Sequence, residues 1–168
     1  SLLAVWMIGL ALFERNDNHS VGIITETRAA PPKAKEALKA WYAGRADREA
    51  YERRKQPYPV YLVSTAGGAL YAAEFAAGAL ARLQDACPGF AQHTFALSAV
   101  SGGALGAAVF SGLVQHAPQI RNDQMNGLDP CHPKGWIPPV RSFEDRAKRF
   151  LDGDFMSPIA AAGLFPDF

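Results

Sequence analysis

The stretch FALSAVSGGALGAAVF, residues 95–110, places Ser101 between two apolar segments of different character. Residues 93–100 include Thr, Phe, Leu and Val, a composition that predicts a β-strand. Residues 102–116 carry no Asp, Glu, Lys or Arg and are dense in Gly, Ala and Leu, which predicts a buried helix. Ser101 therefore stands at a predicted turn from a strand into a helix.

A serine at such a turn has the setting of a nucleophile. The turn is so tight that only small residues fit beside the serine, and the usual pattern is G-x-S-x-G. The sequence Ala99-Val100-Ser101-Gly102-Gly103 follows this pattern with alanine in place of the first glycine. The free amides and the dipole at the start of the following helix favour negative charge, so that an alkoxide or oxyanion would be stabilised there.

A similar unit precedes the serine turn. Residues 59–65 predict a strand and residues 68–86 an apolar helix, and the glycine-rich stretch STAGGALYAA, residues 64–73, joins them. The order strand, helix, strand, helix predicts two neighbouring parallel strands. Both loops then lie at the C-terminal edge of the sheet, where open α/β sheets bind ligands. Glycine amides in the first loop could hold the oxyanion of an acyl-transfer reaction.

The two loops in this order resemble the bacterial branch of the patatin-like phospholipases. In that family a glycine-rich loop, roughly S-G-G-G-I-R-A-A, forms the oxyanion hole, and a G-x-S-G-[GS] turn carries the nucleophile. The resemblance implies that Ser101 is the nucleophile. The oxyanion-hole amides that it implies are those of Gly67, Gly68, Ala69 and Gly102. The segment 154–168 also resembles membrane-anchored members of the family.

Besides Ala99, the chain departs from the family pattern at three further points. Ala69 replaces a loop glycine, and Tyr71 stands where an arginine is usual. The family's serine works with an aspartate in a D-G-[GA] motif far beyond the nucleophile. Asp152-Gly153 begins such a motif, but it follows a helical pattern and is interpreted as surface. The general-base aspartate is therefore expected downstream of this fragment, which alone would be inactive.

The resemblance implies an α/β fold in which residues 59–168 form the βαβα core of a larger, patatin-like acyl hydrolase domain. It implies a serine-dependent phospholipase or esterase that works through an acyl-enzyme on a lipid or acyl-ester substrate, without a cofactor. A hypothesis of a different class is a catalytically inactive, membrane-associated lipid-binding or scaffold module. The missing aspartate, together with Ala69 and Tyr71, motivates this alternative.

An apolar run, LLAVWMIGLALF, opens the chain at residues 2–13. It is shorter than the about 20 residues that a membrane-spanning helix needs. We favour its interpretation as part of a truncated membrane helix over a buried helix or the core of a signal peptide, and assign residues 1–14 to it. Together with the family resemblance, this predicts association with a membrane, namely the bacterial inner membrane.

Residues 15–58 form a charged, helical linker region in this interpretation. Within it, residues 33–55 hold twice as many basic as acidic side chains. Prolines and Gly44 bound a first predicted helix, and residues 46–55 predict a second, solvated one. The basic excess predicts a solvated surface; the alternative is a face that meets anionic lipid headgroups.

Several other functions find no support in the sequence. The net charge of +1 and the lack of a base-stacking pattern argue against nucleic-acid binding. No metal-ligand or dinucleotide-binding pattern is present. Cys87 and Cys131 are interpreted as plain thiols. Residues 117–140 predict a surface loop in which Asp129 and His132 share one exposed turn, and a helix is expected to restart at Ser142. The sequence leaves the oligomeric state open.

Overall fold

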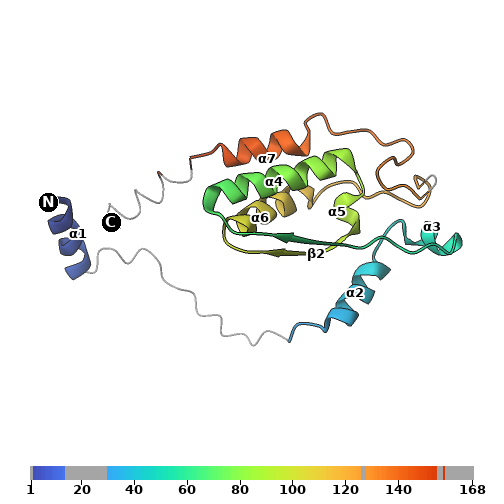
Figure 1. Cartoon of the computed structure of the whole chain (residues 1–168), viewed down its shortest axis with the longest axis horizontal. Coiled ribbons are helices and arrows are strands. Elements are labelled where there is room, and N and C mark those ends of the chain that lie inside the picture. The colour runs from blue at the N-terminus through green and yellow to red at the C-terminus, as the bar shows by residue number, and fades with distance from the viewer. Residues whose placement is uncertain (1, 14–29, 126–127, 155–156, 158–168) are drawn as a thin grey trace. The chain divides into compact units, whose positions relative to one another are not determined.

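The structure is a computed structural model that describes residues 2–13, 30–125, 128–154 and 157. The chain divides into two compact units, one comprising Pro32–Asp152 and the other the two ends, Ser1–Pro31 and Gly153–Phe168. Each is described by itself. Within the first unit, helices and a parallel sheet of two strands form a mixed α/β arrangement (Figure 1).

The predicted order strand, helix, strand, helix is confirmed. Strand β1 (Tyr61–Thr65) leads into helix α4 (Ala69–Ala86), and strand β2 (Thr94–Ala99) leads into helix α6 (Gly102–Val114). A short helix, α5 (Phe90–His93), precedes β2. The strands pair in parallel with Val63 opposite Leu97 and Thr65 opposite Ala99, which brings the C-terminal ends of both strands to the same edge of the sheet.

Helices α4 and α6 cover one face of this sheet (Figure 1). Figure 1 shows α4 and α6 beside the sheet, with α7 (Phe143–Leu151) alongside α4. Val63 and Leu97 point to the covered face and pack against a core of Leu80, Phe90 and Phe110. On the opposite face Leu62 is 74% exposed. The alternation of half-buried and exposed side chains along β1 and along β2 from Phe95 follows from the two-residue period of a strand.

Helix α7 begins as the sequence predicts. The Ser142 Oγ accepts a hydrogen bond from the amide of Asp145 at 3.0 Å. The carboxylate of Asp85, on α4, accepts from the amides of Phe143 and Glu144 at 2.8 and 2.9 Å, which also satisfies the free donors of the first turn. The residues described between α6 and α7, 115–125 and 128–142, form turns without helix or strand, as predicted for this surface loop.

Two further helices lie in the charged region, α2 (Ala34–Ala43) and α3 (Arg48–Arg53). The prediction that the second helix is solvated is wrong, because Tyr51 is only 3% exposed. It packs against Ile120 and Met125 from the loop that follows α6. The charged side chains of α3 lie on its outer face, whereas tertiary contacts bury Ala50 and Tyr51 on its inner face.

Helix α1 (Leu2–Leu12) belongs to the other unit and coincides with the predicted apolar helix. Among the residues described, no helix is both long enough and apolar enough to cross a membrane. The membrane anchor and the boundaries after residues 14 and 58 stay predictions. The segment 154–168, for which a resemblance to membrane-anchored patatin-like proteins is expected, lies outside the described residues apart from Asp154 and Ser157.

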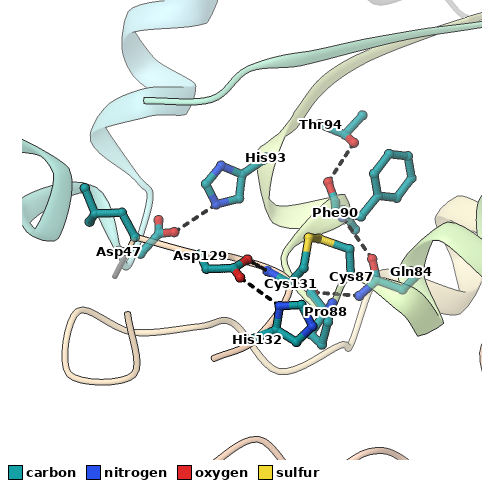
Figure 2. Close-up of a disulfide and its surroundings, with 12 residues drawn as sticks. Asp47, Gln84, Cys87, Pro88, Phe90, His93, Thr94, Asp129, Cys131 and His132 are labelled. Atoms are coloured by element: carbon teal, nitrogen blue, oxygen red, sulfur yellow. Dashed lines mark hydrogen bonds and ion pairs between the residues drawn. A yellow bond between two sulfur atoms is a disulfide. The ribbon is translucent and has the colours of Figure 1, made fainter. Parts of the chain in front are cut away.

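The interpretation of the cysteines as plain thiols is wrong. Cys87, at the C-terminal end of α4, and Cys131, in the loop before α7, form a disulfide across a sequence separation of 44 (Figure 2). A spacing of this length between two cysteines carries no signature of its own, so only the fold reveals the pair.

Candidate functional site

Ser101 occupies the turn between β2 and α6 in a backbone conformation that is rare for a residue with a side chain. Its φ is 51° and its ψ is −131°. At a positive φ, the Cβ comes close to the backbone. A residue strained in this way costs about 1–3 kcal/mol of stability, and such residues cluster at functional sites. The serine is exposed at the N-cap of α6, as the sequence predicts for a strand-to-helix turn.

The glycine loop between β1 and α4 lies directly against this turn. A methyl group built at the Cβ position of Gly67 would lie 3.2 Å from the Ser101 Cβ and 3.8 Å from its Oγ. A Cβ on Gly102 would overlap the carbonyl oxygen of Ala69. The two loops therefore meet at two points. Glycine is needed at position 102, and a side chain at position 67 would crowd the serine.

Hydrogen bonds hold the two loops together. The Thr65 Oγ1, at the end of β1, donates to the carbonyl oxygen of Gly103 at 3.1 Å. The amide of Val100 donates to the Thr65 carbonyl oxygen at 3.3 Å, which extends the strand pairing up to the serine turn. A Cβ on Gly103 would overlap the Ala66 carbonyl oxygen. The end of β1 thus fixes the start of α6.

The backbone of the glycine loop is itself unusual. Gly68 has a φ of 151° and Ala69 a φ of 53°. Within the described residues, the backbone amides of four residues donate no hydrogen bond to the protein: Gly67, Gly68, Ala69 and Gly102. These amides belong to the first turns of α4 and α6 or to the loop before α4, where free donors and the helix dipole favour an anion. The structure thus places Gly67 against Ser101 and Ala69 against Gly102, with Gly68 between them in the loop.

The hydroxyl of Ser101 makes no hydrogen bond to a base within the part of the chain that the structure describes. Asp129 and His132 do pair, and the Asp129 Oδ2 lies 2.7 Å from the His132 Nδ1. The hydrogen bond from His132 holds the pKa of the Asp129 carboxyl below its ordinary value. Their pair lies in an exposed turn next to the disulfide, as Figure 2 shows. Asp152 caps the end of α7 and is exposed, in line with its interpretation as surface.

An apolar cavity of about 410 Å³ begins at the glycine loop. Gly67 and Gly68 line one end, and Tyr71 and Phe75 from α4 line its wall. Both aromatic side chains are largely exposed, at 80% and 71%. Ser101 is not among the lining residues, although it touches Gly67. A second groove, of about 780 Å³ between α4 and α7, shares Tyr71 and Phe75 but reaches neither the serine nor the loop.

A buried polar cluster, missed by the sequence analysis, ties α3 to the start of β2. The His93 Nε2 lies 3.0 Å from the Asp47 Oδ2, and both side chains are fully buried. The Tyr58 hydroxyl donates to the Asp47 Oδ1 at 2.8 Å, and its ring stacks on His93. The His93 Nδ1 lies 3.1 Å from the carbonyl oxygen of Pro59. Asp47 and Pro59 thus hold the imidazole ring of His93 at both of its nitrogens.

Among the described residues, no group of three or more His, Cys, Asp or Glu could hold a metal ion. No family model, no curated protein and no solved structure matches the chain. Fold and site together define an α/β protein in which a strained serine turn rests against a glycine loop with free amides.

Proposed function

We propose that the chain carries the nucleophile and the oxyanion hole of a serine acyl hydrolase of the patatin-like type. The observation that supports this proposal best is the backbone of Ser101, held at a positive φ with the glycine loop in van der Waals contact. A serine with only a structural role at a helix start needs neither the strain nor the adjacent free amides.

In the proposed reaction, the Ser101 Oγ attacks the carbonyl carbon of an ester. The carbonyl oxygen becomes negative and accepts hydrogen bonds from the amides of Gly67, Gly68, Ala69 and Gly102. Each such donor is typically worth about 3–4 kcal/mol of transition-state stabilisation. The alcohol leaves, and water then attacks the acyl-enzyme and releases the fatty acid.

The reaction needs a base to accept the proton of Ser101, because a neutral serine is a weak nucleophile. The proposal assigns this role to an aspartate outside the part of the chain that the structure describes. Ser101 is exposed, and its hydroxyl is open to a further segment. The two-member Ser–Asp arrangement follows the family that the two loops resemble.

The proposed substrate is the acyl ester of a lipid. The apolar cavity that begins at Gly67 is within the size range of ligand pockets, and its wall of Tyr71 and Phe75 suits an acyl chain. The apolar helix α1 supports association with a membrane, for which we propose the bacterial inner membrane. The proposed reaction requires no cofactor.

The experiment is an assay of fatty-acid release from phospholipid vesicles by the full-length protein. We expect release by the wild type and by Ser98→Ala, and loss of release in Ser101→Ala. Ser98 is a matched control because it is an exposed serine three positions earlier on β2, outside the site. Equal release by the Ser101→Ala variant would show that another group carries the reaction.

A non-catalytic lipid-binding or scaffold module is the second candidate. It is favoured by the lack of a base near the Ser101 hydroxyl in the described residues and by Ala69, which keeps a side chain at a positive φ. This candidate predicts that the full-length protein binds phospholipid vesicles but releases no fatty acid. The vesicle assay therefore separates the two functions in one experiment.

A further inference from the structure

The disulfide joins two segments that the rest of the fold already holds together. Cys87 ends α4, and the next residues turn into α5, while Cys131 lies in the loop between α6 and α7. The amide of Gly89 donates to the carbonyl oxygen of Pro130 at 2.9 Å. A Cβ on Gly89 would lie 2.6 Å from the Pro130 Cβ, so only glycine permits this approach.

A second anchor lies near the first. The Gln92 side chain, from α5, accepts a hydrogen bond from the amide of Ile120 at 2.7 Å and donates to the carbonyl oxygen of the same residue at 2.9 Å. Ile120 is fully buried. The loop therefore contacts α5 and its N-cap at two points, Ile120 with Gln92 and Pro130 with Gly89, independently of the sulfur atoms.

The turn that carries each cysteine is also fixed locally. Gln84 on α4 donates to the carbonyl oxygen of Pro88 at 2.8 Å and accepts from the amide of Ala91 at 2.9 Å. The Asp129 Oδ1 accepts from the amide of Cys131 at 2.9 Å. Figure 2 shows these contacts around the sulfur bridge. Hydrogen bonds of the polypeptide thus hold the two cysteine-bearing turns in addition to the sulfur bridge.

A metal site does not account for the pair. Asp129 and His132 are near Cys131, but the described residues contain no metal-binding group of three or more ligands. A persistent disulfide is typical of proteins that mature in an oxidising compartment and is rare where glutathione keeps thiols reduced. The 168-residue sequence contains two cysteines, and the disulfide pairs them across 44 residues.

We propose that the unit Pro32–Asp152 matures on the oxidising side of a membrane, as the substrate of a thiol–disulfide oxidoreductase. A thiolate of Cys87 or Cys131 attacks the disulfide of the oxidoreductase and forms a mixed disulfide. The second thiolate then attacks this bond, so that one S–S bond forms in the chain. The two thiols lose two protons and two electrons, and the oxidoreductase is reduced to its dithiol.

The bond has a definite structural consequence. The loop that it closes carries Ile120, Met125 and Leu128, which pack against Tyr51 of α3. The disulfide therefore stabilises the contact between α3 and the rest of the unit. This inference concerns the location of the domain and does not depend on the activity of Ser101.

The experiment measures thiols rather than acyl transfer. The full-length protein is purified from the cells that make it, denatured without reductant and treated with a maleimide polymer. We expect Cys87 and Cys131 to be unmodified before reduction and each modified once after reduction, and a linked peptide pair containing both residues by mass spectrometry. Modification of Cys87 and Cys131 in the untreated protein would overturn the proposal.

Two controls test the compartment and the structural role of the bond. The same chain retained in a reducing cytosol, or made in cells without the oxidoreductase, should show two reactive thiols. If the bond forms equally in the reducing cytosol, the proposed compartment is wrong. Reductant should lower the unfolding temperature of the wild type but not that of the Cys87→Ser, Cys131→Ser double variant. An unchanged wild-type unfolding temperature would contradict the structural role of the bond.

Discussion

Gly67 and Ser101 are in contact although they come from different βα loops, and a Cβ on the glycine would lie 3.2 Å from the serine Cβ. The substitution Gly67→Ala should therefore push the serine from its position while the core stays unchanged. We expect its reaction with an acylating probe to be about 100-fold slower, the scale of a lost oxyanion donor. Gly78→Ala is the matched control, because a Cβ there has no atom within 4 Å. Equal rates in both variants would contradict the contact.

Ala69 should be a source of strain that glycine relieves. Its φ of 53° lies in the left-handed region, which costs a residue with a Cβ about 1–2 kcal/mol. We expect Ala69→Gly to raise the free energy of unfolding by about 1 kcal/mol, measured by chemical denaturation. Gly68→Ala, at a φ of 151°, should lower it. If Ala69→Gly destabilises the protein, the assigned backbone conformation is wrong.

The contact between α4 and α6 should depend on the absence of a side chain at Gly106. A Cβ at this position would lie 2.8 Å from the Ala76 Cβ, on the facing helix. Gly106→Ala should therefore cost about 1–3 kcal/mol of stability by overpacking. Gly112→Ala, on the same helix but in open space, should stabilise by about 0.5–1 kcal/mol, because alanine favours the helix. Similar effects of both substitutions on the unfolding midpoint would contradict the close approach.

Asp47 should make the stability dependent on pH. Burial acts to raise the pKa of its carboxyl, but hydrogen bonds from His93 and Tyr58 outweigh this effect and hold the pKa below its ordinary value. Such a group stabilises the fold fully above its unfolded pKa of about 4. The stabilisation is lost as the pH falls through the folded value.

Asp47→Asn should therefore lower the free energy of unfolding by about 3 kcal/mol near neutral pH, and the difference from the wild type should shrink below about pH 4. Denaturation measured across this range gives the comparison. Asp123→Asn, in an exposed ion pair with Arg121, should have no measurable effect. A destabilisation by Asp47→Asn that is the same at every pH would exclude the charged carboxylate as its source.

The sequence predicts the core of the fold because its signals are local. Apolar strands and helices alternate from residue 59 to residue 116, and glycines mark both turns, so the serine turn and its contact with the glycine loop follow from chain order. The left-handed backbone of Ala69 agrees with the glycine that the family pattern has at this position. The patatin-like identity of this core stays a proposal.

The features that the sequence did not predict depend on contacts between distant segments. Asp47 and His93 are 46 positions apart, and neither has a pattern around it that indicates burial. The charges of α3 concealed the burial of Tyr51, which depends on a loop about 70 residues away. The disulfide was missed for the same reason, since only the return of the loop to α5 brings Cys131 to Cys87.

The most direct test of the central claim is the site of reaction with a fluorophosphonate, which forms a covalent bond with an activated serine. The full-length protein is treated with the probe, digested and analysed by peptide mass spectrometry. We predict an adduct on the peptide that contains Ser101, its loss in Ser101→Ala and its retention in Ser98→Ala. An adduct on another residue, or no adduct in the folded full-length protein, would contradict the assignment of Ser101 as the nucleophile.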